Sequence, residues 1–241
     1  MIDKNAKVKD KWFGRTIIHS KYRFTYATAE KAIHEKNEIL HKELFTLNDL
    51  AKKLTKERFA NGAISLEQEE VKFVLDKNSV PIKVILKERG DSNKLIEEFM
   101  LLANRQVAET ISTDAKGKKL KIPQSGVFVY RIHDLPNKEK MADLAILLKS
   151  LGYKVSLKNG IIPSFELNEI LKKLEGKNEK ETIQKSVIRS MAKAIYSTKN
   201  IGHYGLAFEY YTHFTSPIRR YPDVMVHRLL EDYVKNKKID Q

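Results

Sequence analysis

The stretch "YYTHFTSPIRRYPDVMVHRLL", residues 210–230, contains two adjacent arginines, a Thr–Ser pair shortly before them, two histidines and two prolines. Apolar residues recur at helical spacing through its second half and just beyond it: Val226, Leu229, Leu230 and Tyr233. A helix is therefore predicted to begin near Pro222, because proline is favoured in a first helical turn and the apolar period starts there. Asp223 would complement the positive end of that helix, whose N-terminus presents free backbone N–H groups to anions.

Arg219 and Arg220 stand just ahead of this predicted helix, and the hydroxyls of Thr215 and Ser216 precede them. Guanidinium groups match phosphate oxygens with a pair of donors, which lysine does not offer. One interpretation of the segment is thus a phosphate clamp. The other is that one arginine pairs with Asp223 or a core carboxylate while the second is solvated, and the residues alone do not decide between them.

Four further residues raise the question of metal or channel sites. His213 and His227 are expected to be ordinary hydrogen-bonded histidines, because no other histidine or carboxylate stands at ligand spacing. Arg131 and His133 lie two residues apart on a predicted strand and share one face, so they could line a channel. A strand arginine near an aspartate is more often paired, however, and a structural role is the preferred interpretation.

Composition points to a basic protein with a polyanionic partner. The 241 residues carry 45 Lys and Arg against 31 Asp and Glu, a net charge of +14. Such an excess suits phosphates, although a surface that serves only solubility would look similar, and composition does not separate RNA, DNA and lipid. The absence of cysteine excludes a disulfide framework and a thiolate metal site. No apolar run is long enough to span a membrane, so a soluble, cytoplasmic protein without a membrane partner is expected.

Periodicity predicts an α+β fold in one domain over residues 1–241, with a mixed β-sheet surrounded by helices and a helix-rich second half. Thr25 and Thr46 are expected to cap the first two helices, and an Asp/Ser pair to cap the third. The predicted helices cover residues 25–36, 46–62, 91–111, 141–152, 163–176 and 181–197. The predicted strands cover residues 70–76, 80–89 and 127–133, after an extended segment at 8–20.

The stretch "THFTSPIRRYPDVMVHR" resembles the signature segment of the RNB catalytic domain of ribonuclease II and ribonuclease R. Four other segments, in the same order as in that family, resemble its ribonuclease R branch: "WFGRTIIHSKYRFTYATAE", "KLIEEFMLLANRQVAE", "GVFVYRIHDLPNKEKMADLAILLKSLGY" and "VIRSMAKAIYSTKNIGHYGLAFEYY". Together they run from about Val8 to the C-terminus, and this colinear set is far more specific than a single motif.

The resemblance implies a processive 3′-to-5′ exoribonuclease that hydrolyses single-stranded RNA to nucleoside 5′-monophosphates at a two-magnesium site. By position it places Arg219 on the scissile phosphate, with Arg220 as second choice, and Thr215 and Ser216 beside the RNA. Such an arginine would stabilise the charge of phosphoryl transfer.

Two RNA contacts are implied less firmly by the same resemblance. Tyr26 would lie near the 3′-terminal nucleotides, and Glu97, or Glu98 by a one-residue shift, would contact the ribose. The alternatives are a tyrosine at the edge of the core, and a glutamate paired with Lys94 or Arg105 on the same helix.

The family's cluster of adjacent, metal-binding aspartates has no counterpart among the aspartates of this sequence. The resemblance therefore implies an incomplete RNB domain, whose Mg²⁺ ligands are expected from a segment missing in this chain, with a complementing polypeptide as one source of it. The alternative is a fragment that binds RNA or such a partner without hydrolysis. A third interpretation, a basic surface for membranes or acidic proteins, leaves "HFTSPIRRYPD" unexplained.

Overall fold

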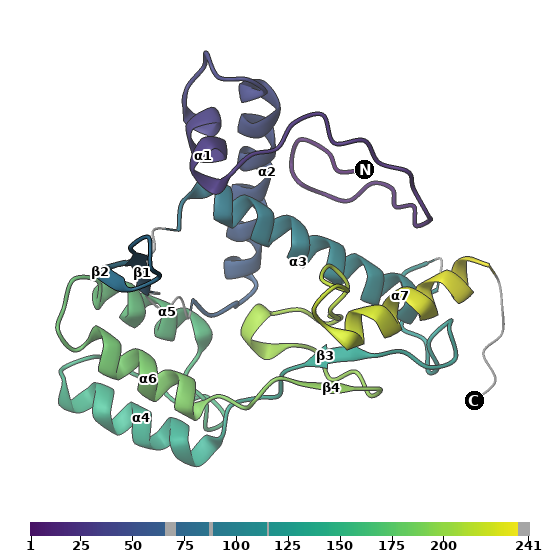
Figure 1. The fold of residues 1–241 in the computed structure, drawn as a ribbon. Helices are drawn as coiled ribbons and strands as arrows, with labels where there is room; N and C mark the ends of the chain where they lie inside the picture. The colour runs from purple at the N-terminus through teal and green to yellow at the C-terminus, as the bar shows by residue number, and fades with distance from the viewer. Residues whose placement is uncertain (66–70, 87–88, 115, 236–241) are drawn as a thin grey trace.

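A computed structural model describes residues 1–65, 71–86, 89–114 and 116–235. Within these residues the chain is α+β, as predicted (Figure 1). The helices are α1 (Tyr26–His34), α2 (His41–Ala60), α3 (Asp91–Ser112), α4 (Lys138–Ser150), α5 (Ser164–Lys173), α6 (Lys180–Ser190) and α7 (Tyr221–Val234), with a 3₁₀ turn at Tyr204–Leu206. The strands are β1 (Val71–Leu75), β2 (Pro81–Leu86), β3 (Tyr130–Ile132) and β4 (Ile195–Ser197).

The described strands form two antiparallel pairs, β1 with β2 and β3 with β4. A parallel bridge between His133 and His203 adds a short contact beside the second pair. The sheet structure of these residues is therefore two small ribbons rather than one broad mixed sheet.

The first two helices differ in how well the sequence predicted their starts. Thr25 caps α1 through a capping box with Thr28, as expected. The prediction that Thr46 caps α2 is wrong, because α2 already begins at His41 after Leu40, whose backbone is left-handed with φ 56°. Thr46 lies inside the helix, and its hydroxyl donates to the Lys42 carbonyl one turn earlier.

Helix α3 runs through the middle of the fold and contributes to two hydrophobic clusters (Figure 1). Its N-terminal half packs against α1 and α2 around Ile33, Ala51 and Leu95. Gly90, not the predicted Asp/Ser pair, is its N-cap residue, and the carboxylate of Glu30 accepts the backbone N–H groups of the first two residues of the helix. The C-terminal half of α3 packs against β3 and α7 in a second cluster: Val107, Ala108, Ile111, Phe128, Tyr130, Ile132, Tyr210, Val226 and Leu230.

Helices α4, α5 and α6 form a third cluster with its own buried side chains, at the lower left of Figure 1. The predicted apolar face of α4 is confirmed, since Met141, Leu144, Ala145 and Leu148 are all buried. The helix predicted over residues 181–197 ends at Ser190. Its last three predicted residues form β4 instead, because pairing with β3 overrides the helical period of the sequence.

Two segments show little packing. The ribbon β1–β2 confirms the predicted hairpin, but Phe73, Ile82 and Val84 are each more than half exposed. The segment at residues 8–20 is extended, as predicted, yet belongs to none of the described strands, and Trp12 within it is 71% exposed. Among the described residues no helix is both long and apolar enough to cross a bilayer.

Candidate phosphate-binding site

The segment at residues 212–220, which we call the arginine segment, leads into α7 and is held in place by Asp223. Asp223 is fully buried in the first turn of α7, as the helix prediction implied. Its Oδ1 accepts a hydrogen bond from the backbone N–H of Ser216 at 2.7 Å and from Nη2 of Arg220 at 2.7 Å. The second oxygen of Asp223 and Nε of Arg220 are buried without a hydrogen-bond partner. Arg220 is therefore held by a buried carboxylate, which is the pairing expected for one of the two arginines.

Arg219 has a different environment from its neighbour. Its residue is exposed, and its backbone N–H donates to the Ser216 carbonyl in the turn before α7. Within the described part of the chain, no carboxylate lies within ion-pair distance of the Arg219 guanidinium. The turn thus exposes the Arg219 guanidinium to solvent, whereas the Arg220 guanidinium is hydrogen-bonded to Asp223.

Asn104 on α3 holds the same segment from a second side. It is 3% exposed, and its Oδ1 accepts the backbone N–H groups of Phe214 at 2.9 Å and Thr215 at 3.2 Å. Its Nδ2 donates to the hydroxyl of Tyr211 at 3.2 Å. Sequence reasoning missed this residue, although an amide inside the apolar run "FMLLANRQV" was a signal that a buried polar partner must exist.

His213 and His227 are hydrogen-bonded histidines, as predicted. A ring nitrogen of His227 lies 2.9 Å from the Phe214 carbonyl, and Nδ1 of His213 lies 2.8 Å from the Tyr196 hydroxyl. Burial and the positive charges of the nearby arginines lower the pKa of His213 to about 4. A neutral imidazole at physiological pH therefore sits in a positive field.

Of the two strand residues expected on one face, His133 is structural. Its Nδ1 accepts the backbone N–H of Gly205 at 3.0 Å, so its Nε2 is the donor to the Ala192 carbonyl at 2.8 Å. Burial lowers the pKa of His133, and burial together with His133 lowers the pKa of His203 to about 3. The expected pairing of Arg131 with an aspartate is not found among the described residues. Its described contact is the ring of Tyr196, 4.7 Å from ring centroid to guanidinium carbon.

The other predicted site residues lie elsewhere on the chain. Tyr26 opens α1 with 56% of its surface exposed. Glu97 pairs with Arg89 at 2.9 Å, rather than with either partner considered from the sequence. Because Glu97 lies two helical turns before Asn104 on α3, it is about 10 Å along the helix axis from Asn104, the residue of α3 that holds the arginine segment. No contact among the described residues joins Tyr26 or Glu97 to Arg219.

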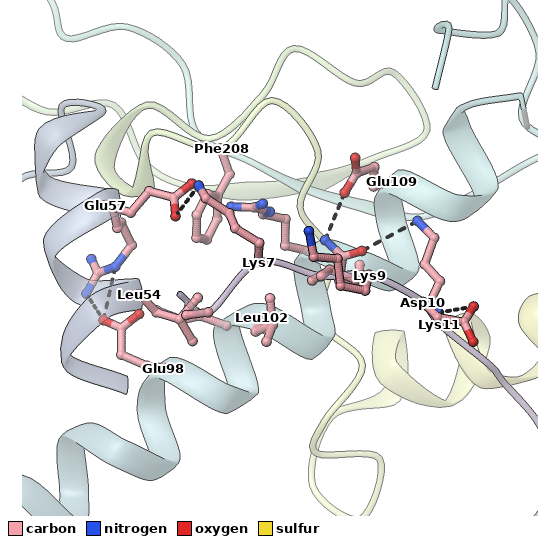
Figure 2. A pocket seen from close by; sticks show the side chains of 16 residues that line it. Lys7, Lys9, Asp10, Lys11, Leu54, Glu57, Glu98, Leu102, Glu109 and Phe208 are labelled. Carbon is pink, nitrogen blue, oxygen red and sulfur yellow. Dashed lines mark hydrogen bonds and ion pairs between the residues drawn. The ribbon is translucent and has the colours of Figure 1, made fainter. Parts of the chain in front are cut away.

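Glu98, the alternative to Glu97, lines a pocket of about 460 Å³ between the N-terminal segment, α2 and α3 (Figure 2). Its carboxylate forms a buried ion pair with Arg58, and the pocket rim carries a second pair between Lys7 and Glu57. Arg105 lies over the Phe208 ring, 5.5 Å from the ring centroid. Since five basic lining side chains face four acidic ones, the net charge of the pocket is small, and the pocket is a weaker anion site than the arginine segment.

The residues described here do not fit a pair of Mg²⁺ ions. Such ions require several converging carboxylate oxygens, and Asp223 is the carboxylate that contacts the arginine segment. One group elsewhere has ligand-like geometry: Glu30, His34 and Asp91. There Glu30 already accepts the N–H groups at the start of α3, and Asp91 pairs with Lys52 at 2.6 Å. That group is accounted for as the junction of α1, α2 and α3.

Comparison with known proteins gives a consistent result. The family model described as RNB domain matches residues 1–236. Ribonuclease R of Aquifex aeolicus (strain VF5) is 34% identical over 247 residues, which cover 100% of this chain and 33% of the relative. Ribonuclease R of Thermotoga maritima is 36% identical over 240 residues, 97% of this chain and 32% of the relative. The chain thus spans about a third of the length of these curated relatives.

Solved structures agree with the sequence matches. Mycoplasma genitalium RNase R in complex with ribose methylated single-stranded RNA superposes with a TM-score of 0.83 at 28% identity, covering 99% of this chain and 37% of that one. Yeast Ssd1, described as a pseudonuclease, superposes with a TM-score of 0.71 at 21% identity, covering 98% of this chain and 28% of that one. The second likeness concerns the fold alone.

Proposed function

This chain belongs to the RNB domain family, and on that premise we propose that it forms the RNA-handling part of a ribonuclease R-like 3′-to-5′ exoribonuclease. The proposed substrate is single-stranded RNA, degraded processively to nucleoside 5′-monophosphates. The observation that carries the proposal is the arginine segment, in which Arg219 is exposed and has no carboxylate partner among the described residues, while Arg220 is paired with Asp223.

Arg219 is proposed to donate hydrogen bonds to the phosphate at which cleavage occurs. A guanidinium contributes most where charge develops on the phosphoryl oxygens, because charge-assisted hydrogen bonds strengthen as that charge grows. Arg220 would act indirectly by fixing the turn through Asp223. Thr215 and Ser216 belong to the same turn, and their half-buried side chains would border the bound strand.

Tyr26 and Glu97 stay proposed contacts for the 3′-terminal nucleotides and the ribose. Both side chains are accessible, Tyr26 at the start of α1 and Glu97 in an exposed ion pair on α3. A carboxylate that accepts a hydrogen bond from the 2′-hydroxyl would favour RNA over DNA.

Mg²⁺ belongs to this proposal as a cofactor whose ligands lie outside the described residues, since those residues do not supply the carboxylates. The comparisons give no support to a separate complementing polypeptide. A cytoplasmic location is likewise a prediction that the relatives' names leave open.

The second candidate function is RNA binding without hydrolysis. It is favoured because Asp223 is the one carboxylate that contacts the arginine segment among the described residues, and the fold is compatible with it because a yeast pseudonuclease shares that fold. Both candidates require the same phosphate contact. They differ in whether the bound RNA is shortened.

The test is a time course of 5′-labelled single-stranded RNA with the purified chain, in Mg²⁺ or in EDTA, resolved to single nucleotides. Gel-shift titrations of the same RNA would compare Arg219→Met with Arg189→Met, which removes an exposed arginine from α6. A Mg²⁺-dependent ladder shrinking from the 3′ end supports the exoribonuclease. Intact RNA with binding weakened by Arg219→Met supports the binding function, and equal binding by both variants refutes the assignment of Arg219.

A further inference from the structure

The face of the β3–β4 ribbon beside the arginine segment carries an arginine, Arg131, that has no acidic partner in the part of the chain that the structure describes. Arg131 and Tyr196 are opposite residues in the antiparallel register and therefore point to the same face. Tyr130 and Ile132, the neighbours of Arg131 on β3, are buried on the opposite face in the core. Arg131 is half-buried, and within the described residues no carboxylate lies within ion-pair distance of it.

The Tyr196 ring fixes the orientation of Arg131. The guanidinium lies over the ring, 4.7 Å from its centroid, and such stacking leaves the N–H groups at the edge of the guanidinium free. The Tyr196 hydroxyl bonds to Nδ1 of His213, which belongs to the arginine segment. Furthermore, the backbone N–H of Arg131 donates to the Tyr211 carbonyl at 3.0 Å. These bonds join β3, β4 and the arginine segment into one surface.

The charge of this surface is strongly positive. Arg131, Arg219 and Arg220 contribute three guanidinium groups, and among the described residues the only carboxylate paired with any of them is Asp223, which contacts Arg220. All three arginines also act to lower the pKa of His213. A half-buried guanidinium without a counter-ion is costly unless a ligand supplies one. The missing counter-charge is therefore best supplied by an anion.

We propose that Arg131 is a second phosphate-binding residue, which holds a phosphodiester of the same RNA strand that Arg219 contacts, and that Tyr196 is a positioning residue for it. This inference rests on the proposed function, because it assumes that Arg219 binds RNA. The guanidinium lies over the Tyr196 ring, and the hydrogen bond to His213 holds Tyr196 in place. The bound chemistry is a phosphate group of a single strand rather than a base edge, since a stacked arginine reads the backbone.

The first test measures the affinity of a 5′-labelled single-stranded oligoribonucleotide over a range of salt concentrations. Arg131→Met should weaken binding about tenfold or more, because a charge-assisted phosphate contact is lost. It should also make the slope of log K against log[salt] shallower by about 0.7, the value for one phosphate contact with a single strand. Arg189→Met removes the same charge far along the chain, on α6, and should leave both quantities close to wild type.

Conservative variants separate positioning from a merely structural role. Tyr196→Phe retains the ring and should retain most of the RNA affinity. Tyr196→Leu removes the ring, and its RNA affinity should fall nearly to that of Arg131→Met. Arg131→Lys keeps the charge and should keep the salt slope while it loses affinity. If circular dichroism shows that Arg131→Met does not fold, Arg131→Lys replaces it in the affinity measurement.

An NMR titration of His213 gives a readout that a structural role would not move. Addition of a 5′-phosphorylated dinucleotide should raise the pKa of His213, since the phosphate offsets the positive field, and Arg131→Lys should reduce this increase.

The outcomes distinguish this inference from the proposed function. If Arg219→Met weakens binding while the Arg131 variants behave like Arg189→Met, the inference is overturned and the proposed function stands. If the Arg131 variants alone weaken binding, Arg131 is a phosphate contact and the assignment of Arg219 fails. If neither position matters, both are overturned.

Discussion

Replacement of Asn104 by alanine should destabilise the fold and weaken RNA binding together. The change removes three hydrogen bonds: two to the backbone N–H groups of Phe214 and Thr215, and one to the hydroxyl of Tyr211. A buried donor left without an acceptor costs about 1–3 kcal/mol. Because Phe214 and Thr215 are only half-buried, water can reach them in part, and the lower end of that range applies to each. The expected loss is about 2–4 kcal/mol in the free energy of unfolding.

The assay is urea denaturation followed by far-ultraviolet circular dichroism. Tryptophan emission would be a poor probe, because the single tryptophan, Trp12, is already exposed in the fold. RNA affinity would be measured on the same variant under native conditions. It should fall, since the arginine segment loses its anchor to α3 and Arg219 becomes less ordered.

The matched control is Asn168→Ala on α5. Asn168 also anchors a loop with its amide, accepting the backbone N–H of Ser65 at 3.0 Å and donating to the Ala63 carbonyl at 2.8 Å. The Asn168→Ala variant should therefore lose stability and keep its RNA affinity. The reasoning is refuted if Asn104→Ala changes stability by less than about 0.5 kcal/mol, the range of ordinary surface substitutions, or binds RNA as well as Asn168→Ala does.

Two other predictions concern buried charge. Glu98→Gln should lower the free energy of unfolding by about 3 kcal/mol in urea denaturation, because it leaves the Arg58 guanidinium buried without a counter-ion. The control Glu97→Gln changes an exposed ion pair and should cost under about 1 kcal/mol. Equal losses for the two variants would contradict this prediction. The urea midpoint should fall as the pH is lowered from 7 towards 4, because the pKa values of His213 and His203 are about 4 and about 3 in the fold against an ordinary 6.5. Protons then bind the unfolded chain first, so the stability present above pH 6.5 is lost on acidification. His213→Gln should flatten this dependence, and a midpoint that rises at pH 5 would refute it.

Local chemistry made much of the fold predictable. The capping box at Thr25, the hairpin of β1 and β2, and the apolar face of α4 depend on residues close together in the sequence. Pro222 and Asp223 likewise marked the start of α7 correctly. In each case the residues that signal the element are also those that stabilise it.

The failures arose where distant residues decide the local structure. The helical period up to Ile195 was overridden by pairing of β4 with β3, which lies more than 60 positions away in the sequence. Residue spacing also left open which of two adjacent arginines would be paired. The choice depends on the buried position of Asp223, which orients its carboxylate towards Arg220 and leaves Arg219 exposed. The amide of Asn104 inside an apolar run indicated a buried polar partner, but the identity of that partner depends on a contact across 110 residues.

The separation of the apolar side chains into three clusters affects how the chain opens. One cluster joins α1 to α3, one joins α3 to β3 and α7, and one belongs to α4, α5 and α6. Proteins tend to open in cooperative units that coincide with such packing, so amide hydrogen exchange should resolve distinct protection levels along the chain. Asn104→Ala should then accelerate amide hydrogen exchange in α7, while the exchange rates of the α4 amides stay unchanged. The arginine segment can consequently loosen and re-form while the helices of the third cluster stay folded.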